Sequence, residues 1–184
     1  KMVLEKYADA QIEIIDSKSN SMQLGFAVLQ AARASKAGKT LEQVKNAALE
    51  NIKRSRFLFI PDNLDYLRKG GRIGGAGALI GNIFKIIPIL TVEDGETSVL
   101  TKARTKRNAV TSMVNKLVED VNEYGLGEVI VHHINCLNEA QELANIIKEK
   151  IGVKIPTIDI GPIIGLHVGP GAIGIAYYTE QDMR

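Results

Sequence analysis

Apolar residues recur along the chain with two different periods, and the period changes from one segment to the next. Residues 21–37, 41–55, 108–123 and 139–150 carry apolar side chains every three or four positions, which is typical of amphipathic helices. Short apolar runs rich in β-branched residues lie between these segments and predict strands. These runs cover residues 11–17, 57–60, 86–92, 97–103, 128–134, 153–160 and 172–178. Strands that alternate with helices predict an α/β fold with some α+β character, in which helices flank a mixed β-sheet.

Individual residues mark where these elements begin and end. Asp94-Gly95 supplies the positive φ angles of a tight turn and predicts a β-hairpin between residues 86–92 and 97–103. Thr40 and Asn138 stand just before helical segments and predict N-caps. Residues 63–69 predict a short helix that the following glycine pair ends.

Composition and charge narrow the class of protein. Of the 184 residues, 45% are hydrophobic and 24% are charged, as in an ordinary globular protein. The net charge of +2 gives no general attraction to nucleic acid or membrane. Cys136 is the only cysteine, so no disulfide can form within the chain, which fits a reducing cytoplasm. No apolar run reaches the roughly 18 residues of a membrane-spanning helix, so no stable membrane insertion is expected.

The segment GPIIGLHVGPGAIG, residues 161–174, places His167 between glycine- and proline-rich turns. Apolar residues flank these turns, so we predict a tight loop set into the core. Glycine allows backbone to approach a ligand closely, and an imidazole can donate or accept a hydrogen bond. The segment is therefore a candidate ligand site.

The sequence lacks the motifs of several kinds of site. The glycine-rich residues 70–81 follow a helix end, and no Lys-Ser or Lys-Thr pair follows them, so neither a phosphate loop nor a dinucleotide fingerprint is present. His132 and His133 are neighbours in a strand and point to opposite faces, so their spacing does not make a metal site. Cys136 has no motif around it and is interpreted as an inert thiol. We expect no metal, no cofactor and no catalytic group.

Two short basic groups stand near the glycine-rich residues and after the hairpin. Arg68, Lys69 and Arg72 surround Gly70-Gly71, and the second group, which follows the hairpin, consists of Lys102, Arg104, Lys106 and Arg107. No aromatic residues are interleaved with them, so we expect no nucleic-acid partner. Two interpretations stay open: solvated surface charge, or guanidinium groups that bind a carboxylate or phosphate.

Two motifs, YLRKGGRI at residues 66–73 and HVGPGAIG at residues 167–174, carry a resemblance to a known family. In this order, and with the hairpin and TKARTKRNA between them, they resemble the DegV family. Proteins of this family look like bacterial fatty-acid carriers, and some serve as the binding subunit of fatty acid kinase. The family carries a further N-terminal α/β segment with a serine-rich, carboxylate-binding loop. Because residues 1–10 look like the end of a helix without an N-cap, we expect this segment to be missing.

The resemblance implies a domain division and a function. Residues 1–60 would be a remnant of an N-terminal α/β domain, and residues 61–184 a C-terminal α/β domain with the His167 loop near the interface. The chain would bind a long-chain fatty acid in an apolar tunnel. It would present the carboxylate to a separate ATP-binding kinase subunit, which forms the acyl phosphate. On this interpretation the bound fatty acid is a ligand, and the chain is not itself an enzyme.

Residue roles follow from the same resemblance. The carboxylate is expected at His167, supported by the glycines of its segment, which are Gly165, Gly169 and Gly171. Arg104 is expected to stabilise negative charge on the acyl phosphate. Partner docking is assigned to Arg72 with Arg68 and Lys69. One departure concerns the neighbours of the histidine, because the family more often has small polar residues where this chain has Leu166 and Val168.

Two functions of other classes remain as alternatives. A hydrolase or transferase could use His167 as a general base, but the sequence nominates no nucleophile beside it. A protein-interaction module without lipid could use the basic residues as its docking surface, and would have no internal tunnel. A sheet edge left open by a missing strand would favour pairing with a second copy, so a homodimer is a further prediction.

Overall fold

The computed structural model describes residue 5, residues 11–80 and residues 86–183, and it contains one mixed six-stranded sheet. The strand order is β3-β2-β1-β6-β4-β5. Only β4 and β5 pair in parallel, and the other neighbouring strands are antiparallel. The strands are β1 (Ser55–Ile60), β2 (Ile87–Glu93), β3 (Glu96–Ala103), β4 (Leu126–His133), β5 (Thr157–Asp159) and β6 (Ile173–Thr179). The predicted mixed sheet with a hairpin is confirmed.

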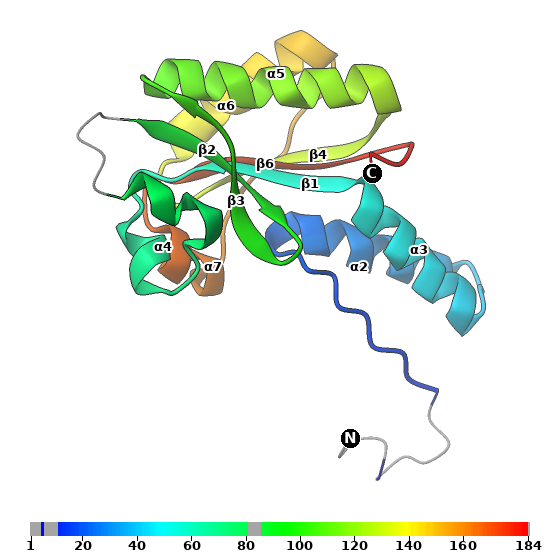
Figure 1. Ribbon diagram of the computed structural model, residues 1–184. Coiled ribbons are helices and arrows are strands. Elements are labelled where there is room, and N and C mark those ends of the chain that lie inside the picture. The colour runs from blue at the N-terminus through cyan, green and yellow to red at the C-terminus, as the bar shows by residue number, and fades with distance from the viewer. Residues whose placement is uncertain (1–4, 6–10, 81–85, 184) are drawn as a thin grey trace.

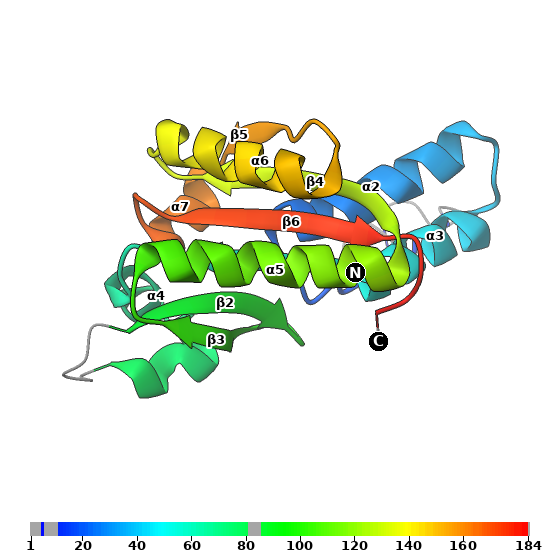
Figure 2. The ribbon, with the colours of Figure 1, turned by 90° about the horizontal axis from the view of Figure 1, so that it is seen from above.

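Helices cover both faces of this sheet (Figure 1). One face carries α5 (Lys106–Tyr124) and α6 (Leu137–Ile151), and α5 runs along β6 (Figure 2). The other face carries α2 (Ser21–Lys36), α3 (Leu41–Arg54), α4 (Asp65–Lys69), the 3₁₀ helix η1 (Gly74–Leu79) and α7 (Pro162–Val168). No helix among the described residues has the length and apolar content needed to cross a bilayer.

The side chains of β1 contribute to two separate apolar clusters, one on each face of the sheet. Leu58 and Ile60 belong to the apolar cluster under α5 and α6, whereas Phe57 and Phe59 belong to the cluster on the opposite face. Successive side chains of a strand point to opposite faces, so the run FLFI is buried on both sides. The face that carries Phe57 and Phe59 is the one on which the candidate site lies.

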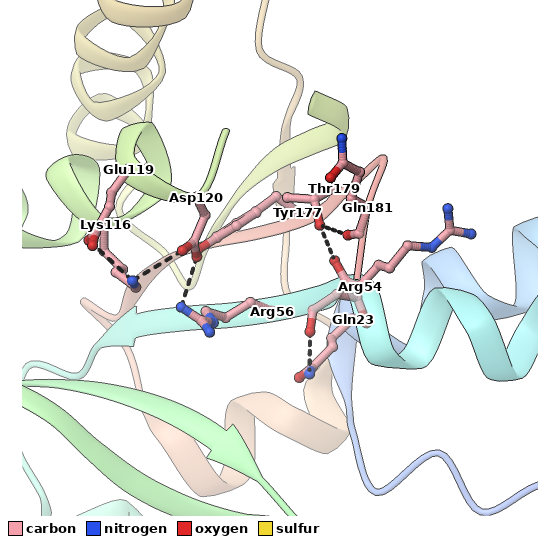
Figure 3. Close-up of polar contacts among 10 residues, drawn as sticks. Gln23, Arg54, Arg56, Lys116, Glu119, Asp120, Tyr177, Thr179 and Gln181 are labelled. Atoms are coloured by element: carbon pink, nitrogen blue, oxygen red, sulfur yellow. Dashed lines mark hydrogen bonds and ion pairs between the residues drawn. The ribbon is translucent and has the colours of Figure 1, made fainter. Parts of the chain in front are cut away.

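A buried polar network fastens α5 to the sheet (Figure 3). The carboxylate of Asp120, only 2% exposed, accepts a 2.6 Å hydrogen bond from the Tyr177 hydroxyl and a 2.8 Å bond from Arg56 Nη1. Lys116 Nζ lies 3.1 Å from its other oxygen. Burial raises the pKa of Tyr177 well above its ordinary value, so this hydroxyl keeps its proton and donates. The network is structural and lies on the face away from the candidate site.

Two local predictions are confirmed in detail. Thr40 caps α3, because its side chain accepts from the Gln43 backbone N–H while the Gln43 side chain accepts from the Thr40 N–H. Asp94 and Gly95 form the hairpin turn with φ angles of 50° and 86°. Both features follow from local chemistry, which the sequence carries directly.

Three local expectations need correction or fall outside the structure. Residues 11–17 form no strand, because no neighbouring strand pairs with them, and Ile14 is 84% exposed. Asn138 does not cap α6, since the N-cap is Cys136 and the helix already begins at Leu137. The expected helix at residues 1–10 lies outside the described residues, apart from Glu5.

The expected domain boundary at residue 60 falls at the end of β1. This strand lies between β2 and β6 in the sheet, so it is part of the same layer as the strands of residues 61–184. The division of the chain into two domains stays a prediction, and β1 belongs to the same sheet as the strands of residues 61–184. The homodimer also stays a prediction, and β3 and β5 are the two edge strands of the described sheet.

Candidate functional site

The segment that carries His167 is mainly helical, which corrects the expected loop. Helix α7 spans Pro162–Val168, with Pro162 in its first turn. Proline at this position has its φ angle set for a helix and lacks an N–H that would have no partner there. Gly169, with a φ of 80°, ends the helix. His167 therefore stands in the last turn of a short helix instead of at the centre of a loop.

A cavity of about 340 Å³ lies between α7, α4, β1 and the hairpin turn. Its volume falls within the range of about 300–1,000 Å³ that is usual for small-molecule pockets. One part of its wall is apolar and consists of Phe57, Phe59, Leu67, Val92, Ile164 and Val168. The two phenylalanine rings stack 5.1 Å apart with an interplanar angle of 16°. The polar lining consists of Asn20, Arg72, Glu96, Thr97 and His167.

His167 is half-buried at this cavity. Its Nδ1 atom is shielded from solvent and has no hydrogen-bond partner among the described residues. The same atom lies against Gly70, where even one added carbon would overlap it. Gly70 therefore covers this nitrogen, and the described residues offer it no hydrogen bond.

Arg72 reaches the same cavity from the other side of Gly70. Its Nη1 donates a 3.2 Å hydrogen bond to the Gly70 carbonyl, and the side chain is otherwise exposed. The structure thus places Arg72 and His167 in the wall of one cavity, although 95 positions separate them in the sequence. A guanidinium and an imidazole N–H are both suitable donors for a carboxylate.

Two other basic residues of the predicted set lie outside the cavity wall. Arg68 is exposed and its Nη2 lies 3.1 Å from Asp65 Oδ1, while Lys69 is exposed at the end of α4. Neither is a lining residue of the cavity, although Gly71, two positions after Lys69, is one. Their role in docking a partner stays a prediction.

The structure does not bring Arg104 to this cavity. Arg104 is exposed and lies between β3 and α5, at the end of the hairpin opposite its turn. Thr97, near the turn, borders the cavity. About 23 Å of extended strand separates the two residues along β3. A direct contact of Arg104 with a ligand in this cavity therefore has no support here.

The three glycines around His167 have different surroundings. Gly169 and Gly171 both have a φ of 80°, a backbone conformation that residues with a side chain rarely adopt. A side chain on Gly169 would overlap the Tyr66 ring, and one on Gly171 would approach Asp62 Cβ at 3.1 Å. Gly165 lies within α7, and a Cβ there would meet nothing within 4 Å. None of the three is a lining residue, so their support for the site is indirect.

The remaining histidines and the cysteine lie in other surroundings. His132 packs edge-on against Phe57, with ring centroids 6.1 Å apart, and burial lowers its pKa to about 4. His133 Nδ1 lies 3.0 Å from Asp159 Oδ1. Burial raises the pKa of the Cys136 thiol, which disfavours a reactive thiolate. No group of three or more His, Cys, Asp or Glu side chains could hold a metal ion in the part of the chain that the structure describes.

Two parts of the cavity were not foreseen from the sequence. Asn20 borders it just before α2, and its Oδ1 is buried with no hydrogen-bond partner in the described part of the chain. Glu96 and Thr97 reach it because the hairpin turn folds over this face. The serine- and asparagine-rich stretch before α2 was the available signal for Asn20, whereas the position of the hairpin turn depends on tertiary packing.

Comparison of the sequence with known proteins gives a consistent result. The model of the DegV family matches residues 1–180. A DegV domain-containing protein of Clostridium acetobutylicum is 68% identical over 183 residues, which is 100% of this chain and 64% of that protein. The chain thus spans about 64% of the length of this curated relative.

Solved structures show the same fold. A fatty acid binding DegV family protein from Streptococcus agalactiae superposes with a TM-score of 0.87 at 24% identity, over 97% of this chain and 63% of that one. A stearic acid-binding protein from Eubacterium ventriosum gives a TM-score of 0.85 at 26% identity, over 97% of this chain and 63% of that one. Sequence and fold agree, and the chain belongs to the DegV family.

Proposed function

We propose that the natural protein binds a long-chain fatty acid, with the acyl chain against the apolar wall and the carboxylate at His167 and Arg72. The observation that carries this proposal is that these two donors line the same cavity as Phe57 and Phe59. The stearic acid bound by the Eubacterium ventriosum protein supports the same ligand class.

The physical requirements of the ligand match the two parts of the cavity. Burying each methylene of an acyl chain contributes about 0.8 kcal/mol, so the apolar wall supplies most of the affinity. A carboxylate buried without partners would cost several kcal/mol. The imidazole of His167 and the guanidinium of Arg72 offset this cost by donating hydrogen bonds.

The carboxylate would then be presented to a separate ATP-dependent kinase subunit, which forms the acyl phosphate. Arg68 and Lys69 are exposed in the last turn of α4, a few positions before Arg72. A basic surface at this place suits docking of a partner that carries acidic groups near its nucleotide site. Arg104 would stabilise negative charge only in a complex whose geometry reaches the far end of the hairpin.

The first test is chemical. Organic extracts of the purified natural protein, analysed by mass spectrometry, should contain about one long-chain fatty acid per chain. Repeated preparations without lipid, together with no measurable affinity for oleate or palmitate, would contradict the proposal.

The second test concerns the residue at the opening. His167→Ala should weaken oleate binding about 10- to 100-fold, because a hydrogen bond to a charged group contributes about 1.5–3 kcal/mol. Lys148→Ala, which removes an exposed basic residue of α6, is the control and should bind as the wild type does. Equal binding by His167→Ala and the control would remove His167 from the site.

A further inference from the structure

Helices α4 and α7 approach each other through two glycines, one on each side. A Cβ on Gly70, at the end of α4, would overlap Nδ1 of His167 and lie 3.2 Å from its Cε1. In return, a Cβ on Gly169, at the end of α7, would overlap the Tyr66 ring of α4. In each helix, a glycine without a side chain therefore leaves room for a ring of the other helix. The imidazole of His167 lies between α4 and the cavity.

The backbone at Gly70 does not itself require glycine. Its φ of −78° and ψ of −2° lie in the right-handed region that any residue adopts. The adjacent Gly71 is the opposite case, since its φ is 66° and a Cβ there would meet nothing within 4 Å. Gly71 is explained by its backbone conformation. The lack of a side chain at Gly70 is explained by its neighbours, because a Cβ there would overlap His167 Nδ1 and would lie 3.1 Å from the Tyr66 carbonyl oxygen.

This contact decides which ring nitrogen of His167 can serve a ligand. Nδ1 faces Gly70, is shielded from solvent and has no hydrogen-bond partner among the described residues. The ring borders the cavity, so Nε2 is the nitrogen left to meet a ligand. In protein interiors, donors without partners are rarer than under-satisfied acceptors. The neutral ring with its proton on Nε2 leaves only a lone pair unsatisfied at Nδ1.

We propose that Gly70 is a positioning residue, which seats His167 in the Nε2–H form so that this group donates to the ligand's carboxylate. The inference rests on the proposed function for the identity of the ligand, but the seating of the ring does not depend on it. Gly70 also accepts the 3.2 Å hydrogen bond from Arg72 Nη1 through its carbonyl. One residue thus supports both donors at the cavity opening.

The test compares two glycine substitutions in the natural protein. Gly70→Ala displaces the imidazole, whereas Gly161→Ala adds the same methyl group at the start of α7, where a Cβ meets nothing within 4 Å. Affinities for oleate and for oleyl alcohol, which share the tail and differ in the head group, are measured for each protein. Gly70→Ala should lower the preference for the acid over the alcohol about tenfold or more, with little change for the alcohol. Gly161→Ala should keep the wild-type preference.

A second measurement needs no substitution. Two-dimensional ¹H–¹⁵N spectra of the imidazole rings report which nitrogen of His167 carries the proton. The Nε2–H form is expected in the wild type, and a mixture of forms in Gly70→Ala. An Nδ1–H form in the wild type, or an unchanged acid preference in Gly70→Ala, would overturn the inference. Absence of any oleate binding by the wild type would instead refute the proposed function, and the spectra would still decide the seating of the ring.

Discussion

Acidification should destabilise the fold through His132, a residue outside the ligand cavity. The side chain is 4% exposed on β4 beside Phe57, and burial lowers its pKa from 6.5 to about 4. The folded state therefore keeps the ring neutral at a pH where the unfolded chain protonates it. Stability rises with pH wherever the unfolded state binds more protons, so this contribution is complete above about pH 6.5 and lost as the pH falls toward 4.

The size of this loss of stability follows from the shift in the pKa of His132. One pKa unit corresponds to about 1.4 kcal/mol, so the whole shift is worth about 3 kcal/mol. Integrated only from pH 7 to pH 5, the loss from His132 is about 2 kcal/mol. Other groups also titrate in this range, so the comparison needs a variant that changes His132 alone.

His132→Leu supplies that comparison, because leucine is similar in size and carries no charge. Urea unfolding followed by circular dichroism at pH 7 and pH 5 gives the free energy of unfolding of each protein. The wild type should lose about 2 kcal/mol more than His132→Leu over this range. Equal losses in the two proteins would refute the argument that a buried neutral His132 drives the pH dependence.

Three further predictions concern packing and capping. Phe57→Ala should cost about 3–5 kcal/mol in urea unfolding, because the ring is 1% exposed, and it should shift the bound lipid toward longer chains in mass spectra. Tyr177→Phe should cost about 1–3 kcal/mol by the same assay, since the 2.6 Å bond to Asp120 is lost. Thr40→Ala should cost about 1 kcal/mol by removing a capping box, whereas Asn138→Ala should stay within about 0.5 kcal/mol.

A specific result would contradict each of these three predictions. Lipid of unchanged length in Phe57→Ala would mean that this ring does not bound the acyl chain. Wild-type stability of Tyr177→Phe would mean that the hydrogen bond from Tyr177 to Asp120 contributes nothing net. A larger loss in Asn138→Ala than in Thr40→Ala would contradict the assignment of the caps.

The parts of the fold that could be predicted are those that local chemistry determines. The Asp94-Gly95 turn and the capping box at Thr40 each need only neighbouring residues, and both are present. Residues 11–17 show the limit, because their apolar residues suit a strand but a strand also needs a partner. The glycines and prolines of α7 suggested a loop, although proline at the start and glycine after the end are also the usual boundaries of a helix.

The residues of the candidate site also differ in whether the sequence alone could reveal them. His167 could be singled out from its glycine-rich motif, and Arg72 from its basic neighbours. Their meeting at Gly70 could not, because it depends on how α4 packs against α7. The apolar wall formed by Phe57 depends in turn on which face of β1 lies under that pair of helices.

The central claim is that the cavity beside His167 holds the head of a fatty acid and the start of its chain. A crystal structure of the natural protein grown with stearate tests this most directly. Continuous ligand density is expected along Phe57 and Phe59, with a carboxylate oxygen within hydrogen-bond distance of His167 Nε2. Stearate bound elsewhere, or a cavity that keeps only solvent at saturating lipid, would contradict it.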